Sequence, residues 1–164
     1  MPPAQIHTRA HVDTVLAEHG LSLPTPSKPV AAYVPTRRVG NVVYVSGQIP
    51  VVDGKLIAEG LVPTHVAEEE AQRCARRCIL NGLAAVFAGI GEDEGIVQII
   101  RLGCFVACTP DFTMHPKVAN GASELLVMVL GDEGRHARAA VGCPSLPLNA
   151  PVEIELIVEV GKAG

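Results

Sequence analysis

The sequence predicts one α+β domain, an open β-sheet with two helices on one face and a short helix before it. Strand-like and helix-like segments follow one another in the order strands, helix, strand, helix, strands, which favours this architecture. The chain has 164 residues, of which 48% are hydrophobic and 18% charged. That length and composition suit a single domain with a buried core and exclude a disordered chain.

The N-terminal part is predicted to be a helix followed by an extended strap. Residues 8–19 carry apolar side chains at near-helical spacing, and Gly20 then supplies a stop. Three prolines in residues 21–29 favour extended backbone. We therefore divide the chain into an N-terminal helix and proline-rich strap, residues 1–30, and a main domain, residues 31–164. The helix is expected to cover the outside of the protein; the alternative is that it caps a ligand cleft.

The main domain contains the segments that define the sheet and the two longer helices. Residues 96–107 form a continuous apolar run, which is typical of a buried central strand. Residues 152–160 alternate, with Val, Ile and Leu on one side and Glu153 and Glu155 on the other. The other predicted elements are a strand at 42–51, an Asp53-Gly54 turn into a strand at 55–57, helices at 64–89 and 116–130, and a strand at 138–142.

Composition and charge argue against several kinds of partner. Aromatic residues make up 3% of the chain, Trp is missing and the net charge is −4, so nucleic acid would find neither stacking platforms nor a basic surface. No apolar stretch approaches the roughly 20 residues that span a bilayer, and no signal peptide is visible, so we expect a cytoplasmic protein without membrane contact. The five cysteines, an odd number, are expected to be reduced and buried, with Cys143 the most accessible.

Motifs for common cofactors are missing from the sequence. It contains no glycine-rich phosphate loop and no GxSxG nucleophile motif. His7 and His11 have the i,i+4 spacing that metal ligands can use, but no Glu or third ligand accompanies them in the sequence. We therefore expect no metal site.

Two charged residues stand out from their surroundings. Arg138 interrupts an apolar strand, where its guanidinium must reach solvent or an anion because burying it unpaired is costly. It either forms a structural salt bridge or grips a ligand carboxylate, for which an arginine fork is the preferred group. Glu153 opens the last strand on the side opposite the apolar stripe, so it belongs either to a solvated sheet face or to a site.

Two segments resemble the signature ends of the RidA/YjgF family, which contains the reactive-intermediate (enamine/imine) deaminases formerly labelled endoribonuclease L-PSP. The segments read VGNVVYVSGQIPV and ARAAVGCPSLPLNAPVEIELIVEV. The resemblance covers about residues 31–160. It is strongest to a longer subgroup that has an N-terminal helix and a segment that reads PDFTMHPKVANGASELL here.

The resemblance implies a chorismate-mutase-like α+β fold, with a mixed sheet and two helices on one face, assembled as a homotrimer. Three sheets would form a central barrel, with ligand clefts between neighbouring subunits. Arg138 would hold a substrate carboxylate, Glu153 would position and deprotonate water, and Tyr33 would help to shape or close the site. The other implied cleft residues are Ser46, Gly47 and Gln48, and Phe112 and Asn120 from the neighbouring subunit.

The implied reaction is hydrolysis of enamines and imines of the 2-aminoacrylate type to 2-oxo acids and ammonia, without a metal or organic cofactor. One departure matters: deaminases of the family commonly carry a Cys two residues after the Arg, and this chain has Ala140. A second hypothesis is therefore a small-carboxylate-binding protein that uses the same cleft without this catalysis. The family's older ribonuclease label is the third, and the acidic, aromatic-poor composition disfavours it.

Overall fold

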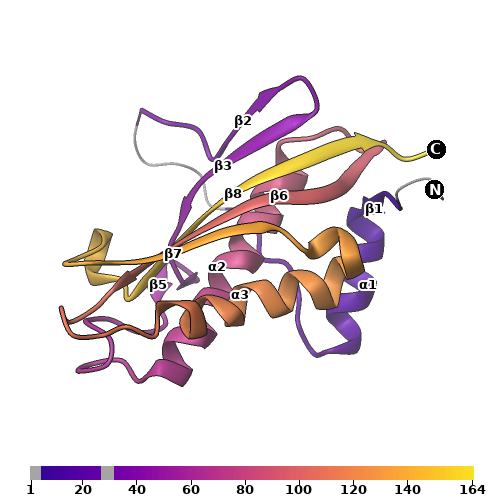
Figure 1. The fold of residues 1–164 in the computed structure, drawn as a ribbon. Coiled ribbons are helices and arrows are strands. Elements are labelled where there is room, and N and C mark those ends of the chain that lie inside the picture. The colour runs from indigo at the N-terminus through magenta and orange to yellow at the C-terminus, as the bar shows by residue number, and fades with distance from the viewer. Residues whose placement is uncertain (1–4, 27–31) are drawn as a thin grey trace.

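The computed structural model describes residues 5–26 and 32–164 and shows helices packed on one face of a mixed sheet (Figure 1). The predicted α+β class is confirmed. The helices are α1 (Arg9–Glu18), α2 (Glu68–Ala88) and α3 (His115–Leu130), with short 3-10 helices at Gly131–Gly134 and Pro147–Asn149. The strands are β1 (His7–Thr8), β2 (Thr36–Val39), β3 (Val42–Gln48), β4 (Val51–Val52), β5 (Lys55–Leu56), β6 (Glu94–Ala107), β7 (Ala137–Cys143) and β8 (Val152–Lys162).

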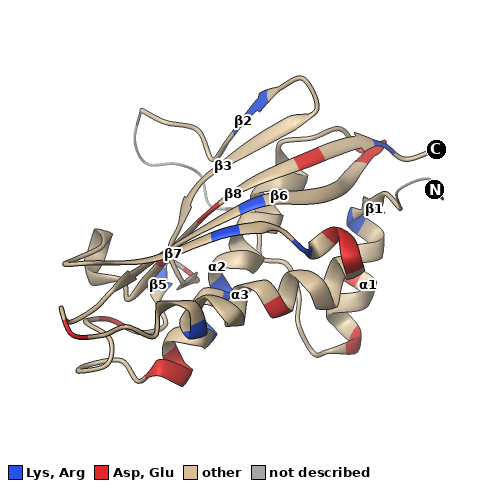
Figure 2. Ribbon diagram, viewed as in Figure 1, with Lys and Arg blue, Asp and Glu red and all other residues tan. Residues whose placement is uncertain are grey.

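The main sheet has the order β1-β6-β8-β3-β2, and β7 also pairs with β6. The β6–β7 pair is parallel and the others are antiparallel, so the sheet is mixed as predicted. Strand β8 lies between β6 and β3, while β7 lies beyond β6 on the other side. Figure 2 shows acidic residues along β8 and basic residues on β6 and β7. One of these charged pairs, Arg101 of β6 with Glu155 of β8, joins neighbouring strands of the sheet.

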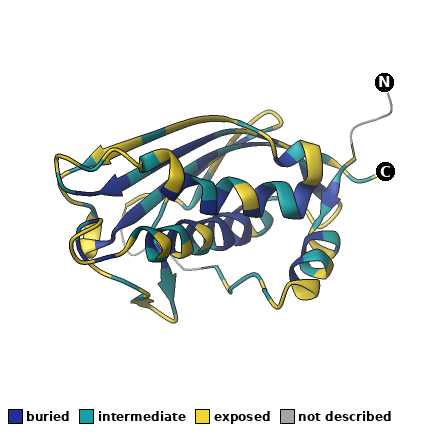
Figure 3. Ribbon diagram, turned by 60° about the horizontal axis from the view of Figure 1, so that its bottom comes forward, coloured by how far each residue is buried: buried dark blue, intermediate teal, exposed yellow. Residues whose placement is uncertain are grey.

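The core lies between the sheet and the two longer helices (Figure 3). Side chains of β8 alternate strictly: Val152, Ile154 and Leu156 are buried, whereas the glutamates between them are half-buried on the opposite face. Helix α2 packs on both α3 and β8. Gly121 of α3 lies so close to the carbonyl of Gln72 in α2 that no Cβ would fit between them. Small residues thus allow the two helices to approach closely.

Two element boundaries and one additional strand differ from the sequence-based expectations, each for a local reason. The helix expected at 64–89 begins at Glu68, after a turn at residues 63–65. The strand expected at 42–51 is interrupted at Ile49-Pro50, because proline has no amide hydrogen for the ladder. Strand β2 was not predicted, since its TRRV sequence is largely exposed and gives no apolar signal. The Asp53-Gly54 hairpin is confirmed, with both residues at positive φ.

The N-terminal helix is confirmed as α1. Thr8 caps it by accepting a hydrogen bond from the backbone N–H of His11 (3.3 Å), and Val12 and Leu16 are fully buried. The helix packs near α3, and β1 pairs with β6, so the segment covers the outer side of the helix layer and one end of the sheet. The predicted boundary between residues 30 and 31 lies outside the described residues, as does the strap beyond Pro26.

Four of the five cysteines are buried, and Cys143 is partly exposed, as predicted. Burial raises the pKa of the Cys74 and Cys104 thiols to about 12, so both are neutral at pH 7. These thiols therefore serve as core side chains.

No helix of the described residues is long and apolar enough to cross a membrane.

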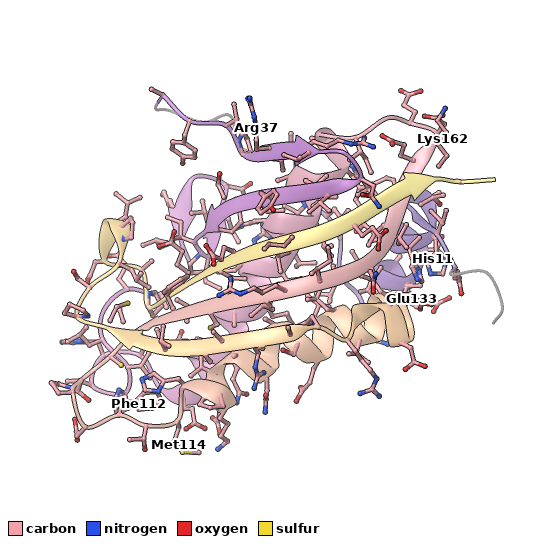
Figure 4. The ribbon with its side chains drawn as sticks, turned by 45° about the horizontal axis from the view of Figure 1, so that its top comes forward. His11, Arg37, Phe112, Met114, Glu133 and Lys162 are labelled. Carbon is pink, nitrogen blue, oxygen red and sulfur yellow. The ribbon has the colours of Figure 1, made fainter. Side chains whose placement is uncertain are left out.

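His7 joins the N-terminal segment to the rest of the protein in an unusual way. It is 3% exposed, and neither ring nitrogen has a hydrogen-bond partner among the described residues. Its Nε2 lies 3.6 Å from Glu133 Oε2, and its ring centroid is 5.0 Å from that of His11 (Figure 4 shows His11 and Glu133 side by side). Burial, and next the neighbouring His11, lower the pKa of His7 against the opposing effect of Glu133.

We expect acid to loosen this junction. Since the folded state lowers the pKa of His7 below its ordinary value of 6.5, docking of β1 and α1 is fully stable above that pH and weakens as the pH falls through it. Hydrogen-exchange protection factors of residues 5–18 at pH 7 and pH 5 measure the effect. A His7→Leu variant should lose most of the pH response, whereas exposed His19→Gln should keep it. An equal response in wild type and His7→Leu would contradict this role.

Candidate functional site

Arg138 lies on the edge strand β7, and its side chain is held by helix α3. One guanidinium nitrogen, Nη1, donates to Asn120 Oδ1 (2.9 Å) and to Ser123 Oγ (3.1 Å). Among the described residues Arg138 has no ion-pair partner, so the alternative of a structural salt bridge finds no support. The side chain is exposed, with neutral partners at one end of its fork. An anion can therefore pair with the other donors.

A short hydrogen-bond chain continues from Arg138 to His136. His136 Nδ1 lies 2.6 Å from the carbonyl oxygen of Gly134, and Nε2 lies 3.0 Å from Ser123 Oγ. Because a carbonyl only accepts, Nδ1 carries the proton, and Ser123 donates its hydroxyl hydrogen to Nε2. The Ser123 oxygen then accepts from Arg138. Burial lowers the pKa of His136, and the charge of Arg138 adds to this, which keeps the ring neutral.

Glu153 lies on the sheet face away from the helices and has an unusual environment. Its carboxylate covers Gly47 of β3 so closely that a Cβ at that position would overlap Oε1. Glu155, two residues on, pairs with Arg101 at 2.7 Å, whereas Glu153 has no ion-pair partner among the described residues. Burial, and then the negative charge of Glu155, raise the pKa of Glu153. Among the described residues Glu153 is therefore not held in a structural ion pair.

A hollow of about 320 Å³ lies next to Gly47. Gly47, Gln48 and Tyr33 line part of it, and the Tyr33 side chain is 56% exposed. Ser46 Oγ donates to the carbonyl of Val34 (2.7 Å), which ties the segment that carries Tyr33 to β3. Tyr33, Gly47 and Gln48 thus line one hollow, Ser46 precedes Gly47 on β3, and Glu153 lies against Gly47. We call Glu153, Gly47, Gln48 and Tyr33 the glutamate cluster.

Phe112 lies away from Arg138, near the C-terminal end of β7 (Figure 4). Its ring makes an edge contact with His115 at a centroid distance of 5.3 Å, and both line a hollow of about 280 Å³. Cys108 Sγ lies 3.4 Å from His115 Nε2 in the same hollow. Within one chain Phe112 therefore belongs to neither the glutamate cluster nor the surroundings of Arg138.

The chain presents Arg138 and Glu153 on opposite faces of the sheet. Arg138 is in register with Leu102, whose side chain is fully buried toward the helices, and Glu153 is in register with Phe105 on the other face. Strand β6 lies between β7 and β8. We call Arg138, Asn120, Ser123 and His136 the arginine cluster. The two charges therefore do not meet within one chain.

Sequence reasoning missed Ser123 and His136. Ser123 lies inside a segment that carries the resemblance and His136 directly precedes another, but neither is a charged residue in an apolar strand, which was the signal that drew attention to Arg138. The one clue was local: His136 lies two residues before Arg138, on the same side of an extended chain.

A mixed sheet of this topology with two long helices on one face is the arrangement of the chorismate-mutase-like class. Residues 13–160 match the family model described as YjgF/chorismate mutase-like, putative endoribonuclease, and the chain belongs to this family.

Three relatives illustrate the similarity. A crystal structure of the protein Atu1372 with unknown function from Agrobacterium tumefaciens is 45% identical, with a TM-score of 0.83 and 93% of each chain covered. Protein TCP17 of Trypanosoma cruzi is 37% identical over 87% of this chain and 90% of its own length. A 2-iminobutanoate/2-iminopropanoate deaminase of Dermatophagoides farinae is 29% identical over 85% of this chain and 94% of its own length.

Proposed function

We propose that this protein hydrolyses reactive enamine and imine intermediates of the 2-aminoacrylate type to 2-oxo acids and ammonia. The observation that carries the proposal is the pair of charges without ionic partners in the described chain: Arg138, anchored by neutral groups, and Glu153, with a raised pKa. A relative named as an imine deaminase adds support. A cation for the substrate carboxylate and a base for water are the two groups that the reaction needs.

The two groups divide the chemistry between them. Arg138 binds the substrate carboxylate through donors that Asn120 and Ser123 leave free. The enamine becomes the imine by gaining a proton at carbon and losing one from nitrogen, with no net change in protons. Glu153 accepts a proton from the water that attacks the imine carbon and then returns it to the amine nitrogen. The resulting carbinolamine collapses when its protonated amine leaves as ammonia, and the C=O bond of the 2-oxo acid forms. Orientation and proton transfer are the protein's contributions.

The proposal includes assembly of the site from two copies of the chain in a homotrimer. Arg138 and Glu153 face opposite sides of one sheet, so a substrate cannot bridge them directly within one copy. A neighbour that places its arginine cluster against the glutamate cluster would complete the cleft. The uncovered sheet face, which carries exposed Tyr44 and Val141, offers an apolar surface for such packing.

A coupled assay tests the activity. An amino-acid oxidase generates the imine, and semicarbazide traps whatever this protein does not hydrolyse. Wild-type protein should reduce semicarbazone formation in proportion to its concentration, across alanine-like and larger apolar amino acids. Failure to compete with the trap for every amino acid tested would overturn the deaminase proposal.

The pH profile should report the Glu153 base. Since burial and Glu155 raise the pKa of Glu153 above its ordinary 4.5, kcat/KM should fall with decreasing pH along a limb whose midpoint is above 4.5. A Glu155→Gln variant removes the second cause and should shift this limb to lower pH, while Glu153→Gln should remove most of the activity. An unshifted limb in Glu155→Gln would show that another group is titrating.

A second candidate function is binding of a small carboxylate without turnover. Ala140, in place of the Cys that deaminases of the family commonly carry, favours it, because a thiol next to the substrate is missing. In that case small 2-oxo or amino acids would raise the melting temperature through Arg138, yet semicarbazone formation would stay unchanged.

A further inference from the structure

Two adjoining hollows lie beneath the N-terminal strap, between residues 21–26 and the helix layer. One is the hollow of about 320 Å³ beside Tyr33, and the other measures about 330 Å³. Both are lined by Pro24, Thr25, Val51 and Asn81, so the two hollows adjoin, and together we call them the strap cavity. A combined space of this size is within the range of small-molecule sites.

Arg77 of α2 lies in the second hollow without an ionic partner. Its Nε donates to the carbonyl of Val51 (2.9 Å), and the described residues provide no partner for its other nitrogens. No carboxylate of the described chain forms an ion pair with it, and residues 1–4 and 27–31 contain no Asp or Glu. Burial lowers the pKa of Arg77. The negative charge of Asp53, which lines the same hollow, partly offsets this effect without forming an ion pair, so the half-buried guanidinium keeps donors that an anion can accept.

The other walls of the strap cavity indicate the chemistry of the rest of the ligand. Toward the first hollow the walls become apolar, with the lining residues Pro26, Tyr33, Pro35, Ile49, Ala85 and Leu148. Near Arg77 the polar lining includes Ser22, Thr25 and Asn81, and also Asp53. The Asp53 carboxylate repels a second negative charge, which disfavours a phosphate dianion and favours a monoanion. The cavity therefore suits one charged head and an apolar body.

We propose that the strap cavity is a second ligand site, which binds a monocarboxylate with an aromatic or branched apolar body. The carboxylate pairs with Arg77, and the apolar body lies under the strap toward Tyr33. This site shares Tyr33, Gly47 and Gln48 with the glutamate cluster, but it takes its positive charge from Arg77 and not from Arg138, and it does not depend on the proposed deaminase activity. Because Gly47 and Gln48 line the same cavity, a bound ligand would lie next to the glutamate cluster.

Calorimetric titration of the full chain with phenylacetate tests this site. We expect saturable binding of one phenylacetate per chain, and at least about tenfold weaker binding of phenylacetamide, which lacks the charge, and of acetate, which lacks the apolar body. Arg77→Gln should weaken phenylacetate binding by at least about tenfold, and Arg77→Lys by less. Arg76→Gln, an exposed neighbour on the same helix, is the matched control and should bind like wild type.

The Arg138→Ala variant separates the two sites. It should lack imine hydrolysis but keep the phenylacetate binding that Arg77→Gln weakens. The inference is overturned if phenylacetate gives no saturable binding up to about 10 mM, or if binding persists in Arg77→Gln and disappears in Arg138→Ala. If wild-type protein bound phenylacetamide as tightly as phenylacetate, the inference would also be overturned. This comparison does not rely on any variant.

Discussion

An Arg138→Ala variant is expected to lose imine hydrolysis by about 100-fold or more in kcat/KM. Removing the guanidinium takes away the group that holds the substrate carboxylate, and a hundredfold loss corresponds to roughly 2.7 kcal/mol of transition-state binding. Stability should hardly change, because the side chain is exposed and its partners Asn120 and Ser123 can turn to water. The semicarbazide-coupled assay measures the first effect and thermal unfolding the second.

Arg135→Ala is the matched control. Arg135 lies three residues before Arg138 in the sequence. Its side chain is 73% exposed and forms a local ion pair with Asp132. Its removal should leave the activity within about twofold of wild type, because exposed ion pairs contribute little. Equal losses in the two variants would point to a general effect of surface charge and would contradict a specific role of Arg138.

Mixing two inactive variants tests assembly of the site across copies. If Arg138 and Glu153 of one cleft come from different subunits, Arg138→Ala and Glu153→Gln chains refolded together should recover about a quarter of the wild-type activity, since about a quarter of clefts combine two intact groups. If both groups came from one chain, every cleft would carry a defect. No recovery in verified mixed oligomers would then exclude the shared cleft.

Gly121→Ala is expected to destabilise the protein by about 2–3 kcal/mol. The added methyl would overlap the Gln72 carbonyl oxygen, and backbone of α2 cannot move aside as a flexible side chain can. The α2–α3 contact must therefore open, and α3 carries Asn120 and Ser123, which anchor Arg138. Thermal unfolding should show a melting temperature lower by about 5–10 °C.

Gly82→Ala provides the comparison within the same helix layer. A Cβ there would lie 3.3 Å from Leu156 Cδ1, the end of a flexible side chain, and alanine favours a helix by about 1 kcal/mol over glycine. The stability of Gly82→Ala should therefore lie within about 1 kcal/mol of wild type. If both variants were equally destabilised, close backbone approach at Gly121 would not be the cause.

The α+β class and most of the elements could be predicted from the sequence, and so could the two charges of the candidate site. These follow from local patterns: alternation along β8, the apolar run of β6, and the helical periodicity of α2 and α3. Arg138 and Glu153 could be singled out because a charged residue in or beside an apolar strand must form an ion pair, reach solvent or bind a ligand. Strand β2 gave no such signal, since its side chains are largely solvent-exposed.

The neighbours of each charged side chain could be seen only in the tertiary structure. Parallel pairing of β7 with β6 sets Arg138 on the helix side, where α3 supplies Asn120 and Ser123, while the β6–β8 register turns Glu153 to the other face. It also places the strap over Arg77, although residues 21–26 and that helix are about fifty positions apart in the chain. Pairing register and helix approach are set by contacts between distant segments, and a one-residue shift would reverse every side chain of a strand.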